Sequence, residues 1–136
     1  MWHCTREIND NFIQLKTAAM ADFLFIFRGG ESGELKKQSL EKWQLHMQKW
    51  TQWMGDLNGQ GKFGGAQPLK QTGKVVKGPS KTETDGPFME GKEMVGGYLV
   101  CKGVSYEEAV EIAKSCPILV YESGIVEIRE IGEMHV

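Results

Sequence analysis

Asp22-Phe23-Leu24-Phe25-Ile26-Phe27-Arg28 is the stretch of sequence that decides the fold. Its five central residues are all apolar, so the side chains on both faces of an extended chain need burial. A strand with one face in water would alternate apolar and polar residues instead. The glycine-rich turn over residues 29–33 ends this strand. It lacks the G-x-G-x-x-G spacing of a phosphate-binding loop.

A second strand of the same kind is predicted over Val95 to Lys102. Tyr98 and Val100 point to one face of it, and Leu99 and Cys101 point to the other, because successive side chains of a strand alternate. Both faces of this strand are therefore apolar, as in the first strand.

Two helices are predicted to separate the strands. The first runs from Ser39, a suitable N-cap, to Asn58. Its apolar residues recur at helical spacing in one stripe, formed by Trp43, Met47, Trp50, Met54 and Leu57. His46 lies roughly 60° from the centre of this stripe, on the side of Trp53, and is expected at the border between core and solvent. The second helix begins at the capping box Ser105-Tyr106-Glu107-Glu108 and ends at Pro117.

Shorter strands are predicted over Lys62 to Gln67, around Val75-Val76, and over Ile125 to Ile131, with a polar loop over Gly78 to Thr84. The resulting order β-α-β-β-β-α-β predicts an α+β fold, a ferredoxin-like sandwich with a mostly antiparallel sheet. Residues 1–19 are expected to be an N-terminal extension, and residues 20–136 the domain.

The uncovered face of the sheet predicts a partner. Two helices cover one face, yet the two central strands are apolar on both, and each apolar side chain left in water forgoes roughly 1.5–3 kcal/mol. We therefore expect a homodimer that packs sheet on sheet about a two-fold axis. Clefts of such a dimer, lined by residues such as Trp53 and Tyr98, would suit a small, partly apolar ligand.

The composition excludes several function classes. With 136 residues and a net charge of −2, the chain has room for one core and no basic field for nucleic acid or anionic lipid. Its three cysteines lack metal-ligand spacing, so neither a metal nor a cofactor is expected. No apolar run is long enough for a membrane span, and the first twenty residues do not resemble a signal peptide, which predicts a cytoplasmic protein.

The segment Thr84-Asp85-Gly86-Pro87-Phe88-Met89-Glu90-Gly91-Lys92-Glu93 carries the strongest local signal for a turn. Asp85-Gly86 favours a turn, and Pro87 has no N–H to continue a sheet ladder. Phe88 supplies a large apolar side chain. Such a turn would aim Asp85 at a fixed place, either as a functional carboxylate or as a capping residue of a well-made turn.

Several of these segments together resemble the YCII-related proteins, specifically their DGPF-motif branch. The matching runs are Phe27-Arg28-Gly29-Gly30, Trp50-Thr51-Gln52-Trp53-Met54, Asp85-Gly86-Pro87-Phe88 and Gly96-Gly97-Tyr98. The resemblance covers residues 20 to about 131. It implies a dimeric α/β barrel of ferredoxin-like units. It also implies a His–Asp pair like the one proposed as an active site in shorter members, which His46 and Asp85 would supply.

Two functions follow from the resemblance. In the first, His46 and Asp85 meet and perform cofactor-free proton transfer on a small molecule, in a reaction of the isomerase, lyase or hydrolase type. Arg28 would hold a ligand carboxylate or form a surface salt bridge, and Trp53, Phe88 and Tyr98 would line the site. In the second, the protein is a non-catalytic ligand-binding or regulatory dimer, because DGPF proteins are associated with alternative sigma factors. A histidine at a helix border is also commonly a structural residue.

Overall fold

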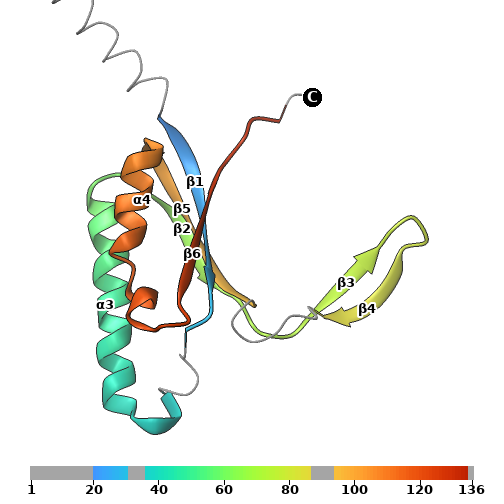
Figure 1. Ribbon diagram of the computed structural model, residues 1–136, viewed down its shortest axis with the longest axis horizontal. Helices are drawn as coiled ribbons and strands as arrows, with labels where there is room; N and C mark the ends of the chain where they lie inside the picture. Colours follow the sequence, from blue (N-terminus) through green and yellow to red (C-terminus); the bar gives the residue numbers. More distant parts are fainter. Residues whose placement is uncertain (1–19, 31–35, 87–93, 135–136) are drawn as a thin grey trace, which may run out of the picture.

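A four-stranded antiparallel sheet with two helices on one face forms the body of the protein (Figure 1). The computed structural model describes residues 20–30, 36–86 and 94–134. The elements, in chain order, are β1 (Ala21–Arg28), α3 (Leu40–Gly59), β2 (Phe63–Pro68), β3 (Gly73–Lys77), β4 (Thr82–Gly86), β5 (Val95–Val104), α4 (Tyr106–Lys114), a 3₁₀ turn (Pro117–Val120) and β6 (Ile125–Glu130). The sheet order β2-β5-β1-β6 is compatible with a ferredoxin-like α+β fold.

The core lies between this sheet and the helices. Phe23 and Phe25 of β1 are fully buried there, as are their partners in β5, Cys101 and Leu99. Directly opposed residues of two strands point to the same face, so both strands place this set toward the helices. The prediction that β1 and β5 are central strands is confirmed.

Helix α3 begins where the sequence predicts, because the Ser39 hydroxyl accepts a hydrogen bond from the backbone N–H of Lys42. The predicted stripe is confirmed for Leu57, which is buried, and for Trp43, Trp50 and Met54, which are half-buried. His46, Trp53 and Leu57 are the buried residues of this helix, whereas Met47 is exposed. The 3₁₀ turn lies beside the middle of α3 (Figure 1) and packs against it, and the ring of Tyr121, directly after the turn, packs on His46. The buried face of α3 is therefore shifted toward His46 and Trp53 and away from Met47.

Helix α4 starts at the predicted capping box, in which the Ser105 hydroxyl accepts a hydrogen bond from the N–H of Glu108. The helix ends at Lys114, and Pro117 begins the 3₁₀ turn that follows. In the part of the chain that the structure describes, no helix is long and apolar enough to cross a membrane.

Strands β3 and β4 form a separate two-stranded hairpin that projects from the body of the protein (Figure 1). The predicted strand around Val75-Val76 is confirmed as β3, and the predicted loop over Gly78 to Thr84 is confirmed for residues 78–81, which form the turn of the hairpin. The prediction is wrong for residues 82–86, because β4 continues through Gly86 and pairs Asp85 with Lys74. Hydrophobic alternation reveals a strand only when one face of it is buried. All residues of β3 and β4 except Gly86 are exposed, so the pattern carries no such signal.

Candidate functional site

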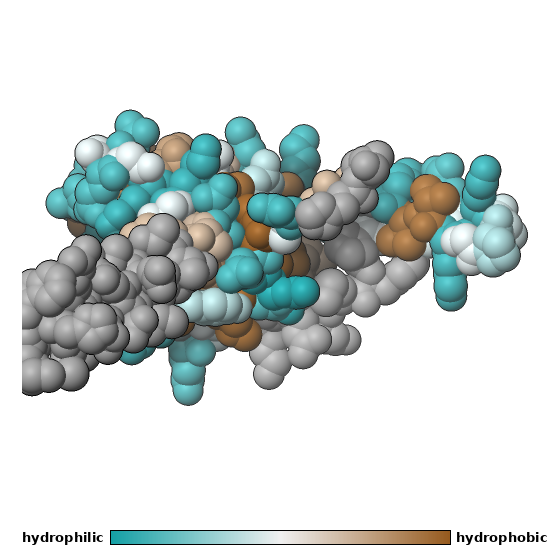
Figure 2. Space-filling view, turned by 90° about the horizontal axis from the view of Figure 1, so that it is seen from above, coloured by the Kyte–Doolittle hydropathy of each residue, from teal (hydrophilic) through white to brown (hydrophobic). Residues whose placement is uncertain are grey.

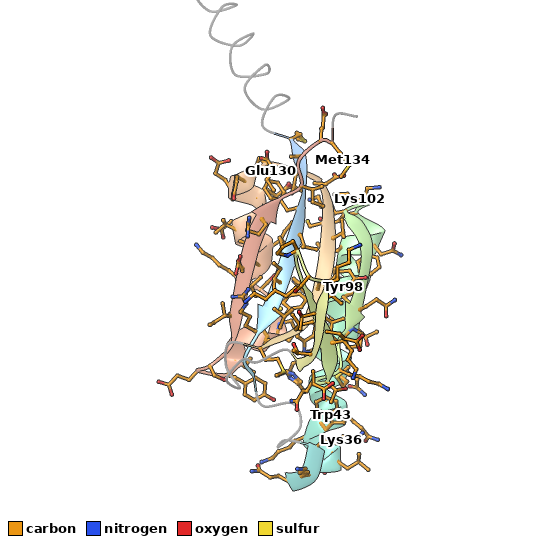
Figure 3. The ribbon with its side chains drawn as sticks, turned by 90° about the vertical axis from the view of Figure 1, so that its right-hand side faces the viewer. Lys36, Trp43, Tyr98, Lys102, Glu130 and Met134 are labelled. Carbon is orange, nitrogen blue, oxygen red and sulfur yellow. The ribbon has the colours of Figure 1, made fainter. Side chains whose placement is uncertain are left out.

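The sheet face opposite the helices is covered by neither α3 nor α4 (Figure 1). We call it the open face, and it presents Leu24, Ile26, Tyr98, Val100, Glu127 and Arg129. Tyr98 pairs with Ile26 and Val100 with Leu24 across the two central strands, and all four side chains are half-buried. Figure 3 looks onto this side of the sheet, with Tyr98 labelled near its middle. The face therefore has an apolar centre and charged side chains on β6.

Charged groups gather at one margin of the open face. Arg28, at the end of β1, places Nη2 at 3.1 Å from Oε1 of Glu127, and Nη1 of Arg129 lies 3.3 Å from Oε2 of the same carboxylate. Nε of Arg28 is buried, and among the described residues it has no hydrogen-bond partner. Because buried polar groups are nearly always paired, Arg28 is a candidate residue for binding an anion. Arg28 was predicted as a binding residue from the sequence, but Glu127 was not, because its only signal is a charge between the apolar residues of β6.

His46 is buried, with 8% of its surface exposed, and the prediction that it lies at the border of the core is wrong. Nε1 of Trp50 donates a hydrogen bond of 3.0 Å to Nε2 of His46. The ring of Tyr121 packs edge-on against the imidazole, with the ring centroids 5.2 Å apart. Burial lowers the pKa of His46, and the positive charge of Lys49 lowers it further. This environment holds the imidazole neutral, with Nε2 occupied as an acceptor.

Asp85 lies on the projecting hairpin, where its carboxylate is 2.6 Å from Nζ of Lys74. Its side chain is 83% exposed. The hairpin and α3 lie on opposite sides of the sheet (Figure 1), and no hydrogen bond or ion pair joins Asp85 to His46, both of which are described residues. The structure does not bring the two candidate catalytic residues together.

Trp53 belongs to the core. Its ring contacts those of Phe25 and Phe27, and its Nε1 donates a hydrogen bond of 3.0 Å to the hydroxyl of Ser115. One edge of the indole borders an open groove of about 520 Å³ between α3 and the 3₁₀ turn, which Lys49 and Lys114 also line. A second open groove, of about 710 Å³, runs along the outer side of α3. Neither groove is lined by His46, Asp85 or Tyr98, and Phe88 lies outside the described residues.

The described cysteines form no reactive or metal site. Burial raises the pKa of Cys101 to about 11 and that of Cys116 to about 12, so both remain protonated thiols. Within residues 20–30, 36–86 and 94–134, no three His, Cys, Asp or Glu side chains are grouped in a way that could hold a metal ion.

Comparison with known families gives one match. The model of the YCII-related domain matches residues 33–135, which is most of the chain. No curated protein matches the sequence.

Proposed function

This chain belongs to the YCII-related family, and we propose that it is a member of the DGPF-motif branch that works as a two-fold dimer and binds a small organic anion. The branch assignment rests on the run Asp85-Gly86-Pro87-Phe88. The single observation that carries the binding function is the open face, whose apolar centre ends at Arg28, with a buried N–H that has no partner among the described residues.

The dimer is supported by the chemistry of the open face. Leu24, Ile26, Tyr98 and Val100 occupy adjacent positions on the two central strands, and neither helix lies over them (Figure 1). Two such faces, packed about 10 Å apart, would bury these side chains against each other in the manner of a sheet sandwich. The charged residues on β6 would then form the polar rim that such interfaces have. A pair of sheets closed in this way is the dimeric α/β barrel.

The ligand class is inferred from Arg28. Its guanidinium has five N–H donors, and Glu127 engages only one end of it. A carboxylate of a small molecule matches the planar fork of the remaining donors. The ring of Tyr98, on the same face, would contact the apolar part of that molecule. We therefore infer a small, partly apolar or aromatic carboxylic acid as the ligand.

The contacts of His46 and Asp85 support non-catalytic ligand binding better than they support proton transfer. A general base must face the ligand with a free lone pair. Nε2 of His46 already accepts the N–H of Trp50, and Asp85 is paired with Lys74 at the protein surface. The alternative, cofactor-free proton transfer by His46 and Asp85, lacks an assembled pair. A ligand-binding regulatory dimer needs no such pair.

A thermal-shift screen of small carboxylic acids tests this function. The Arg28→Met variant is expected to lose the stabilisation that a bound acid gives to the wild type. Arg129→Met is the matched control, because Arg129 contacts the same Glu127 but keeps no buried N–H. If the ligand-induced stabilisation is lost equally in both variants, or in neither, Arg28 is not a specific binding residue. A ligand whose effect disappears in His46→Gln but not in Arg28→Met would favour the proton-transfer function instead.

A further inference from the structure

The β3–β4 hairpin is not part of the four-stranded sheet and projects from it. It forms a two-stranded sheet of its own, in the register Lys74↔Asp85 to Lys77↔Thr82. Figure 1 shows it reaching away from the four-stranded sheet. A two-stranded hairpin alone in water is marginally stable at best, because it buries little apolar surface. The contacts within this hairpin do not change that. Its one ion pair, Lys74 with Asp85, is highly exposed, and exposed ion pairs contribute little.

Two valines on the hairpin are exposed. Val75 is 37% exposed and Val76 is 67% exposed, and as neighbours on a strand they point to opposite faces. Figure 2 shows a hydrophobic patch on the hairpin, with polar residues beside it. Exposed β-branched apolar side chains on a protruding ribbon suit an interaction surface. The stability of the isolated chain does not require them.

The charge of the hairpin is opposite to that of the rest of the protein. Residues 73–86 contain three lysines and two acidic residues, a formal charge of +1, within a chain of net charge −2. The remainder of the chain therefore has thirteen basic and sixteen acidic residues, a charge of −3. A surface of one sign attracts a surface of the other, so the body of a second copy is an electrostatically suitable partner for the hairpin.

The direction of the hairpin agrees with this partner. It projects on the side of the sheet that faces away from α3 and α4 (Figure 1), which is the side of the open face. A second copy that packs on the open face would lie within reach of the hairpin. Since each copy carries one hairpin, a two-fold dimer would contain two such hairpin contacts.

We propose that the β3–β4 hairpin is an arm that packs, through Val75 and Val76, on the body of a second copy of this chain. The partner rests on the proposed dimer, and the arm is an addition to it. Burial of one valine in each contact is expected to tighten the dimer about tenfold or more. Asp85 and Lys74, at the base of the arm, would then be interface residues and not members of a catalytic pair.

Sedimentation equilibrium of matched variants tests the arm. Val76→Glu replaces an exposed arm residue with a group that the acidic body repels, and it is expected to raise the dimer dissociation constant about tenfold or more. Val120→Glu is the matched control, because Val120 is 65% exposed and lies on the helix side of the molecule. Val100→Glu tests the open face separately. An unchanged dissociation constant for Val76→Glu would overturn the arm.

Hydrogen exchange of residues 73–86 provides a second measurement. In wild type, the amides of the hairpin are expected to be protected at high protein concentration and to exchange faster on dilution below the dissociation constant. Exchange at the same rate at every concentration would overturn the arm. A wild-type chain that is monomeric throughout would overturn both the arm and the dimer. If Val100→Glu loses the dimer and Val76→Glu keeps it, the sheets pair but the hairpin is not an interface arm. If Val76→Glu loses the dimer and Val100→Glu keeps it, the hairpin is an interface arm but the sheets do not pair.

Discussion

The indole of Trp50 donates its Nε1–H to Nε2 of His46 across one turn of α3, at 3.0 Å. A nitrogen that accepts a hydrogen bond carries no proton, so this contact requires a neutral imidazole. Burial of His46 acts in the same direction, because desolvation disfavours the charged form. The bond therefore links the orientation of Trp50, whose ring packs edge-on against Phe27, to the protonation state of one histidine.

The stability of the protein is expected to decrease in mild acid because of His46. Its folded pKa is lowered from the ordinary value of 6.5, so below that pH the unfolded chain binds a proton that the folded chain does not. The free energy of unfolding should fall between pH 6.5 and the folded pKa, by at most about 1.4 kcal/mol per pH unit. Above pH 6.5 the full contribution is present. Urea unfolding across this range measures the slope.

The control for this slope is His46→Gln, which places a neutral amide at the same position of α3. The difference in slope between wild type and this variant isolates His46 from the carboxylates that titrate at lower pH. Identical slopes in the two proteins would show that the folded state accepts the proton on His46, and that its burial has no effect on titration.

Asp85→Asn is expected to change the free energy of unfolding by less than about 1 kcal/mol, because it removes one partner of a highly exposed ion pair with Lys74. It should also leave the titration of His46 unchanged, since the two residues share no contact. Imidazole chemical shifts as a function of pH measure the second effect. A shift in the His46 titration would indicate that the two side chains are coupled after all.

Two glycine substitutions are expected to have opposite effects. A Cβ at Gly124 would lie 2.0 Å from the carbonyl oxygen of Ile118, so Gly124→Ala must displace the backbone of the 3₁₀ turn. We expect it to lower the free energy of unfolding by about 2 kcal/mol or more. A Cβ at Gly55, in the C-terminal half of α3, meets no atom within 4 Å, and Gly55→Ala should raise stability by about 0.5–1 kcal/mol. Thermal unfolding of both variants measures the difference, and a neutral Gly124→Ala would contradict the close approach.

Cys101 and Cys116 are expected to resist thiol reagents in the folded protein. Both are buried, and their pKa values are raised to about 11 and about 12. In a Cys4→Ser background, Ellman's reagent should label neither thiol of the native chain and both thiols after denaturation. Fast labelling of either one without denaturant would show that its segment opens readily, because access would then require local unfolding.

The amino-acid sequence was enough to predict the elements that local signals define. The apolar run of residues 23–27 predicted a central strand, and Ser39 and Ser105 predicted the two helix starts. These signals act within a few residues, because side-chain alternation and capping bonds involve near neighbours only. The sequence predicted the first strand of the exposed hairpin, around Val75-Val76, but not the second, since Thr82–Gly86 contains no apolar residue and shows no alternation.

The tertiary structure alone decided which groups meet. Helix periodicity placed His46 at the edge of a stripe, but the 3₁₀ turn and Tyr121, more than seventy residues later in the chain, bury it. The motif around Asp85 suggested a catalytic carboxylate, and pairing with β3 placed it on a projecting arm beside Lys74. Contacts of this kind depend on how segments that are distant in sequence pack against one another. A pattern within one segment does not contain that information.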